Sequence, residues 1–234
     1  MESWMQEQLE QLTQERDESK LLTAALKMVQ QLEFEFISFV MRAPVATSQP
    51  KVVMLSNHPS EWLDTYQKLN YVTIDPTVAH CFSSMLPILW QDAVFAETPE
   101  FWEQAKSYGL RYGWGLSAHD HRGRASMLSI GRSENAISIT EHWEKAGQTY
   151  WLCHLLHATL TDKPNELEAS SSHLTEREIE VLRWSADGKK AHEIADILNV
   201  SERTVTFHVQ SAMNKLGAAN KTSAVIQAAM RGLL

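Results

Sequence analysis

The sequence predicts an α+β protein of two domains, in which a mixed domain of helices and strands precedes an all-helical one. Apolar residues recur at helical spacing at both ends of the chain. Short runs rich in aromatic and branched residues, typical of strands, occur only in the first two thirds. Residues 161–172 are polar, contain a proline and end in three serines, so both periodicities stop there. A chain of 234 residues is long enough for two such domains.

The N-terminal part is expected to combine helices with a central sheet. The predicted helices cover residues 1–33, 61–69, 101–109 and 139–160, with a short helical piece around His80, and the predicted strands cover residues 34–42, 52–56 and 125–132. Asp75 and Pro76 are interpreted as a turn. The spacing in helix 139–160 predicts one shared face for Trp143, Ala146, Tyr150, Cys153 and His157.

The C-terminal part begins with two short helices. Thr175 is placed to cap the first helix, Glu178 completes a capping box, and Gly188 ends the helix. The second helix covers residues 191–198 and is followed by a tight turn at residues 199–201. The expected inward positions are Ile179, Leu182 and Ala186 in the first helix, and Ile194, Ala195 and Leu198 in the second.

A third helix runs from its N-cap at Ser201 to a stop at Gly217. The inward face is expected to hold Val205, Val209, Ala212 and Leu216, and the outer face Arg203, Thr206, Gln210, Met213 and Asn214. A short helix, a tight turn and a second helix with a polar outer face are typical of a helix-turn-helix that enters a major groove. From the pattern alone, a small helical bundle with a solvated face stays open.

The charge distribution favours the first of these two interpretations. The net charge of −8 argues against a nucleic-acid partner. However, residues 1–172 carry −9 and residues 173–234 carry +1, and no Asp or Glu follows Glu202. Basic charge at one end of an acidic chain predicts one surface that faces phosphate.

The stretch LTEREIEVLRWSADGKKAHEIADILNVSERTVTFHVQSAMNKLGAANKTSAV resembles the LuxR/FixJ-type helix-turn-helix throughout its length. The resemblance implies that Thr206 and Gln210 face bases in double-stranded DNA. It also implies phosphate contacts from Ser201, Arg203, Thr204 and Lys215. Lys190 stands where a small hydroxyl residue is commoner and adds a charge that can reach phosphate. A last helix, about residues 222–231, is implied to help the protein bind a palindromic site as a homodimer.

Polar residues interrupt the apolar N-terminal part at a few positions. Trp62 and Tyr66 are four residues apart and share a helix face, Asp75 lies in an apolar region, and Ser38 and Ser129 interrupt strands. Each residue alone also fits an ordinary packing or capping role. Together they predict an apolar pocket with a few polar groups for a small amphipathic ligand. A phosphoacceptor domain is rejected because no acidic pair follows the strand at residues 34–42.

The pattern SNHPSEW, Tyr66, Asp75-Pro76, Trp90 and GWGLS resembles the autoinducer-binding domain of LuxR-type quorum-sensing receptors over about residues 15–160, most of all the QscR-type solo receptors. The resemblance implies a GAF/PAS-like α/β/α sandwich with no cofactor and an N-acyl-homoserine lactone as ligand. Trp62 would donate to the lactone carbonyl, Asp75 would accept the amide N–H, and Ser129, with Ser38, would meet the amide oxygen. Tyr66 and Trp90 would pack the ligand.

His58 departs from the pattern, because several relatives have a tyrosine there. A LuxR-type regulator of another small molecule, or one that acts without ligand, therefore stays open. The expected domains are residues 1–162 for the ligand, a linker at 163–172, and residues 173–234 for DNA. The absence of a signal sequence and of a long apolar run predicts a cytoplasmic protein with reduced Cys81 and Cys153.

Enzyme and metal functions are not expected. Cys81 beside His80 has no third catalytic partner, and a lactonase would reveal itself by consuming the lactone. Cys153 with His157, and the His119–His121 turn, offer too few ligands for a metal.

Overall fold

The computed structural model describes residues 12–15, 17–42, 52–161 and 174–234. The chain divides into two compact units, called here the N-terminal and the C-terminal domain. The predicted linker at residues 163–172 and the first residues of the predicted helix 1–33 lie outside the described residues, so these boundaries stay predictions. No described helix is long and apolar enough to span a membrane.

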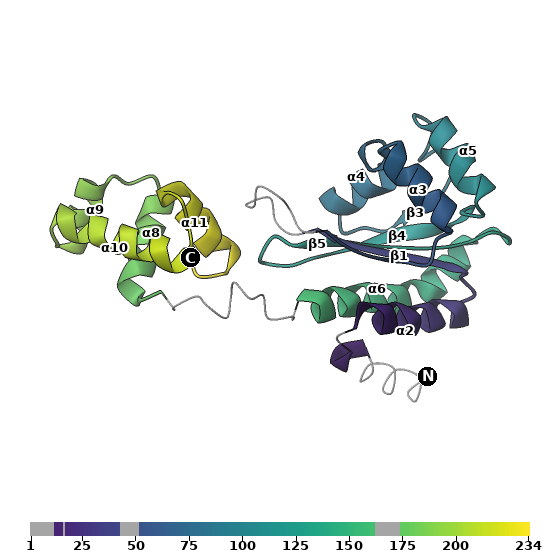
Figure 1. Cartoon of the computed structure of the whole chain (residues 1–234), viewed down its shortest axis with the longest axis horizontal. Helices are drawn as coiled ribbons and strands as arrows, with labels where there is room; N and C mark the ends of the chain where they lie inside the picture. The colour runs from purple at the N-terminus through teal and green to yellow at the C-terminus, as the bar shows by residue number, and fades with distance from the viewer. Residues whose placement is uncertain (1–11, 16, 43–51, 162–173) are drawn as a thin grey trace. The chain divides into compact units, whose positions relative to one another are not determined.

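The N-terminal domain is a five-stranded antiparallel sheet between two helical layers, which confirms the predicted α/β/α sandwich (Figure 1). The strands are β1 (Phe36–Arg42), β2 (Val52–Ser56), β3 (Ile88–Leu89), β4 (Tyr112–His119) and β5 (Ala125–Arg132), in the order β2-β1-β5-β4-β3. Helices α2 (Glu18–Gln31) and α6 (Ile139–Thr161) cover one face. The other face carries α3 (Ser60–Lys68), the 3₁₀ turn η1 (Tyr71–Thr73), α4 (Pro76–Ser83) and α5 (Pro99–Ser107).

The structure corrects the predicted elements in three places. Strand β1 begins at Phe36 rather than at residue 34, because the chain leaving α2 turns through Glu33 at a φ of 64°. Asp75 and Pro76 begin helix α4 rather than a simple turn, since Asp75 caps it and proline fits the first helical position. Strands β3 and β4 were not predicted, and glycines inside β4 weaken its strand pattern.

The layer formed by α2 and α6 is packed around Trp114 of β4. The Trp114 ring meets the edge of Phe34 at 4.8 Å and the ring of His142 at 4.8 Å. The predicted face of α6 was wrong at Trp143, which is 68% exposed, whereas the neighbouring His142 is buried. The other predicted positions of this face are buried or half-buried. Beside His142, Glu141 accepts two hydrogen bonds from Arg132, of 2.7 and 2.8 Å.

The C-terminal domain consists of α8 (Glu176–Ala186), α9 (Ala191–Leu198), α10 (Glu202–Leu216) and α11 (Lys221–Met230). The capping box of Thr175 and Glu178, the Ser201 cap and the Gly217 stop are confirmed. Two predicted positions were wrong. Val181 rather than Ala186 fills the core beside Leu182, because α8 ends at Ala186, which is exposed. Met213 packs against the core rather than facing outward.

Candidate functional site

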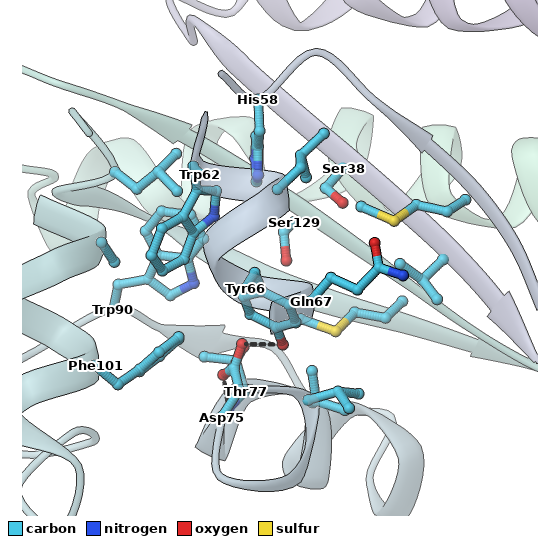
Figure 2. Close-up of a pocket in the computed structure, with 18 of the residues that line it drawn as sticks. Ser38, His58, Trp62, Tyr66, Gln67, Asp75, Thr77, Trp90, Phe101 and Ser129 are labelled. Atoms are coloured by element: carbon cyan, nitrogen blue, oxygen red, sulfur yellow. Dashed lines mark hydrogen bonds between the residues drawn. The ribbon is translucent and has the colours of Figure 1, made fainter. Parts of the chain in front are cut away.

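A cavity of about 570 Å³ lies between the sheet and the layer formed by α3, α4 and α5. Its lining includes every ligand-contacting residue that the sequence predicted, namely Ser38, His58, Trp62, Tyr66, Asp75, Trp90 and Ser129. Figure 2 shows these side chains gathered around one space, although they come from five separate segments of the chain. Most of the remaining lining is aliphatic or aromatic.

Asp75 combines a structural and a potential binding role. Its Oδ1 accepts hydrogen bonds from the backbone N–H and the hydroxyl of Thr77, at 2.9 and 2.6 Å, and thereby caps α4. Its Oδ2 accepts a hydrogen bond from the Tyr66 hydroxyl at 3.0 Å (Figure 2). Burial raises the pKa of Asp75, while these hydrogen bonds act in the opposite direction. The carboxyl oxygens keep lone pairs for one more donor.

Two ring nitrogens around the cavity lack a hydrogen-bond partner among the described residues. They are Nε2 of His58 and Nε1 of Trp90, and both are buried. Burial lowers the pKa of His58 to about 4, so its imidazole is neutral at pH 7. An unpaired buried polar group costs about 1–3 kcal/mol, so a ligand that supplies partners gains affinity.

Trp90 lies against a flat area of the sheet that two glycines create. Gly113 and Gly131 are directly opposite each other on β4 and β5. A Cβ atom would approach the Trp90 ring to 2.8 Å at Gly113 and to 2.6 Å at Gly131. The same glycines that weaken the strand pattern of β4 therefore make room for the indole.

The sheet side of the cavity changes from polar to apolar along β1. Ser38 pairs directly with Ser129 of β5, and both are buried. Two residues further along, Val40 pairs with Met54 of β2 and Met127 of β5, and all three line the cavity. A polar end and an apolar end are what an amphipathic ligand requires.

Aromatic rings form the opposite wall. Trp62 lies within 6.0 Å of the rings of Tyr66, Tyr71, Phe101 and Tyr108. Sequence reasoning missed several lining residues, among them Gln67, Thr77, Phe101, Trp102 and Met127. Thr77 was detectable as the residue that an Asp75 cap binds, whereas the others depend on how α3, α5 and β5 meet.

The Cys81–His80 pair does not form a nucleophile and base. His80 Nε2 is 2.9 Å from the carbonyl oxygen of Leu86. The Cys81 thiol is buried where a Cβ on Gly115 would lie 3.2 Å away, and burial raises its pKa to about 12.

Helix α10 presents an exposed, mostly polar stripe. The exposed residues at helical spacing are Arg203, Thr206, Phe207, Gln210 and Asn214. Sequence reasoning missed Phe207, which is 67% exposed. The Thr206 hydroxyl donates to the carbonyl of Glu202 at 3.0 Å, and the Gln210 amide donates to Asn214 at 3.3 Å. Ser201 caps the helix and its hydroxyl is 2.7 Å from that of Thr204.

Lys215 lies beside an acidic partner inside the domain. Its ammonium is 2.8 Å from Glu178 Oε2, and the two side chains are 23% and 4% exposed. The same carboxylate accepts hydrogen bonds from Ser211 at 2.7 Å and from the backbone N–H of Thr175 at 2.7 Å. Burial opposes the charge, yet these partners lower the pKa of Glu178 to about 2. The predicted phosphate contact of Lys215 stays a prediction, and the ion pair gives it a competing role.

Lys190 occupies the N-cap of α9. Its backbone N–H donates to Glu193 at 2.8 Å, which is one half of a capping box. Because a lysine side chain has no acceptor atom, it makes no capping hydrogen bond in return. The side chain is exposed and its contact with phosphate stays a prediction.

Comparisons with known proteins match both domains. The protein-family model of the autoinducer binding domain matches residues 17–160. The family model of bacterial regulatory proteins of the luxR family matches residues 172–228. The transcriptional activator protein AnoR of Acinetobacter nosocomialis is 40% identical, and the match covers 100% of both chains. The quorum-sensing regulator RhlR of Pseudomonas aeruginosa is 34% identical over 89% of this chain and 87% of its own.

The fold resembles SdiA of Escherichia coli along its length. The crystal structure of SdiA matches with a TM-score of 0.80 and 31% identity, covering 99% of this chain and 98% of SdiA. A structure of SdiA in complex with octanoyl-rac-glycerol matches with a TM-score of 0.78, covering 97% and 94%. The particular likeness to QscR-type receptors stays a prediction. The chain belongs to the LuxR family, as a transcriptional regulator rather than an enzyme, with an autoinducer-binding domain and a helix-turn-helix DNA-binding domain.

Proposed function

We propose that the N-terminal domain binds an N-acyl-homoserine lactone and that the C-terminal domain binds palindromic DNA as part of a homodimer. The observation that carries the proposal is a largely apolar cavity whose lining includes Asp75, the ring nitrogens of His58 and two tryptophans, and two serine hydroxyls. The head group of such a lactone has one amide N–H and two carbonyl oxygens. A carboxylate acceptor and several donors complement these groups.

The assignments within the head-group site follow the chemistry of each side chain. Asp75 accepts the amide N–H with a lone pair that the Thr77 and Tyr66 bonds leave free. Trp62 donates to the lactone carbonyl, and Ser129, with Ser38, donates to the amide oxygen. His58, as a neutral imidazole, donates or accepts according to its tautomer.

The apolar end of the cavity suits an acyl tail of about ten carbons. Strand β1 advances four residues from Ser38 to Arg42, which pairs with Val52. At about 3.3 Å per residue, this distance along the strand is about 13 Å. An extended chain with C–C bonds of about 1.5 Å advances about 1.3 Å per methylene. Val52, Met54 and Val72 line the cavity and are half exposed, so a tail that covers them removes apolar surface from water.

A second candidate ligand is a fatty-acid ester of glycerol. SdiA, which matches this chain along nearly all its length, is described in complex with octanoyl-rac-glycerol. The tail of such an ester would use the same apolar rows, and its free glycerol hydroxyls would meet Asp75 in place of the amide N–H. A hydroxyl both donates and accepts, so the ester should tolerate Asp75→Asn better than a lactone, whose amide N–H can only donate.

The test is thermal unfolding of the full chain with a chain-length panel of N-acyl-homoserine lactones and with octanoyl-rac-glycerol. A ligand at 100 times its Kd stabilises by about 2.7 kcal/mol, which raises Tm by about 5–10 °C for a domain of this size. The largest shift is expected near ten carbons. If no lactone shifts Tm and the glycerol ester does, the second candidate replaces the first.

Matched variants assign the contacts. Trp62→Phe keeps the ring but loses the donor, and should weaken lactone binding by about 1–3 kcal/mol. Trp102→Phe removes the same group from the same cavity wall, but its indole N–H already donates to Asp92 at 2.7 Å. It should therefore affect affinity much less. Asp75→Asn keeps an oxygen to cap α4 while placing a second donor against the lactone amide.

Dimerisation and the DNA site need separate measurements. Sedimentation of the liganded chain at increasing salt reports the oligomeric state. Selection from randomised duplexes should return a palindrome with half-sites about one helical turn apart. Recovery of a single, unpaired half-site by a monomer would contradict this part of the proposal.

A further inference from the structure

Phe207 is an exposed aromatic side chain in the middle of the stripe of α10. The residue is 67% exposed, whereas the other face of this helix holds the buried Val205, Ala212 and Leu216. The ring meets the His208 ring edge-on at 5.7 Å, a contact that restricts its orientation. Packing within the domain therefore does not account for a phenylalanine at this position.

The neighbours of Phe207 indicate what it meets. Arg203, Thr206 and Gln210 lie on the same exposed stripe, at spacings of three and four residues from it. Arginine, threonine and glutamine side chains are able to hydrogen-bond to base edges or phosphates, and no Asp or Glu follows Glu202 to repel phosphate. The other large apolar residues exposed in the described part of the C-terminal domain are Ile197 and Ile226, which belong to α9 and α11.

Protein-binding surfaces are instead formed by contiguous apolar patches. A single ring flanked by polar groups fits a base edge better, because thymine alone displays a methyl group in the major groove. Phe207 lies in the second turn of α10, and the N-terminal turns of a recognition helix are those that contact bases.

We infer that Phe207 selects thymine at one position of each half-site by packing its ring against the C5-methyl group. This inference rests on the proposed DNA binding and adds an apolar determinant to the polar contacts of Thr206 and Gln210. Removing one buried methyl group is expected to weaken binding about fourfold.

The test replaces single thymines by deoxyuridine, which lacks only the methyl group. A site is first selected from randomised duplexes with the full-length chain and the lactone panel, and affinities are then measured by fluorescence anisotropy. When deoxyuridine replaces one particular thymine of each half-site, the wild type should bind DNA about fourfold more weakly. Phe207→Ala should bind the unmodified site more weakly than the wild type does, and deoxyuridine at that position should not weaken its binding further. For Phe207→Leu, deoxyuridine should still weaken binding, but by less than about fourfold.

Ile197→Ala is the matched control, because it also removes an exposed apolar side chain and should leave the deoxyuridine effect intact. The inference is overturned if no thymine is sensitive, or if Phe207→Ala retains the full loss. A Phe207→Ala variant that binds DNA normally but fails to activate transcription would instead assign the ring to a protein partner. Failure to select any DNA would refute the proposed DNA binding itself, and this inference with it.

Discussion

Replacing Lys215 with alanine is expected to destabilise the C-terminal domain rather than to remove one phosphate contact. The side chain of Glu178 is 4% exposed, and its carboxylate would remain buried without its cation. Breaking a buried pair by removing one partner costs about 3–5 kcal/mol. Lys215, Ser211 and the backbone of Thr175 together lower the pKa of Glu178 from 4.5 to about 2, so Lys215 accounts for part of a stabilisation of about 3 kcal/mol.

Hydrogen exchange of the full chain measures this effect where it occurs. A loss of about 3 kcal/mol corresponds to roughly a hundredfold faster exchange of the slowest amides of α8 and α10. Glu178→Gln combined with Lys215→Met removes both charges and should recover much of the protection. Exchange in the N-terminal sheet should be unchanged and serves as the internal control.

The salt dependence of DNA binding separates the two roles of Lys215. A phosphate contact contributes about one unit to the slope of log affinity against log salt. Lys215→Ala should leave this slope unchanged, whereas Arg203→Ala, at an exposed position of α10, should flatten it by about one. Unchanged exchange together with a flatter slope for Lys215→Ala would refute the structural role.

Acid should weaken the ion pair of Glu178 and Lys215. A carboxyl whose folded pKa is lowered stabilises the fold above its unfolded pKa, here about 4.5, and the contribution is lost as pH falls through about 2. The wild type should therefore lose stability over this range more steeply than the double variant of Glu178 and Lys215. Parallel acid titrations followed by near-UV circular dichroism measure the difference.

Three further substitutions test other contacts. Gly131→Ala places a Cβ atom 2.6 Å from the Trp90 ring, so the indole should move into the cavity and weaken lactone binding about tenfold, as measured by calorimetry. Unchanged affinity would contradict the inference that the glycines make room for the indole. Lys190→Thr supplies the missing cap oxygen of α9 and should raise stability by about 1 kcal/mol in thermal unfolding, with weaker DNA binding only if the lysine contacts phosphate. Glu141→Gln breaks the paired hydrogen bonds with Arg132 and should cost about 2 kcal/mol in urea unfolding; a neutral result would show the pair to be dispensable.

Local signals in the sequence determined the C-terminal domain almost completely. A helix that begins at a Thr or Ser cap and ends at a glycine carries its boundaries in a few adjacent residues, as Thr175, Ser201 and Gly217 do. The spacing of apolar residues also predicted most of the core. The errors at Ala186 and Met213 arose because the helical period of apolar residues does not decide which residues at the margin of a helix face contact another helix.

The pocket required more than local signals. The sequence identified some of the polar residues that line it, because Ser38, Asp75 and Ser129 are conspicuous in apolar surroundings. It did not identify β4 as a strand, because glycine is uncommon in strands. Gly113 is needed there because the indole of Trp90, which is remote in sequence, packs over it. Nor did it place Gln67 or Met127 in the cavity wall.

The sequence by itself therefore determined the two domains, the helix boundaries of the DNA-binding module and the chemical character of a ligand site. Only the tertiary structure decided that Lys215 pairs with Glu178, that Phe207 stands exposed among polar neighbours, and that the cavity changes from polar to apolar along β1. The physical reason is that capping and periodicity act between residues a few positions apart. Ion pairs, cavities and cross-strand rows join residues whose separation in sequence carries no such signal.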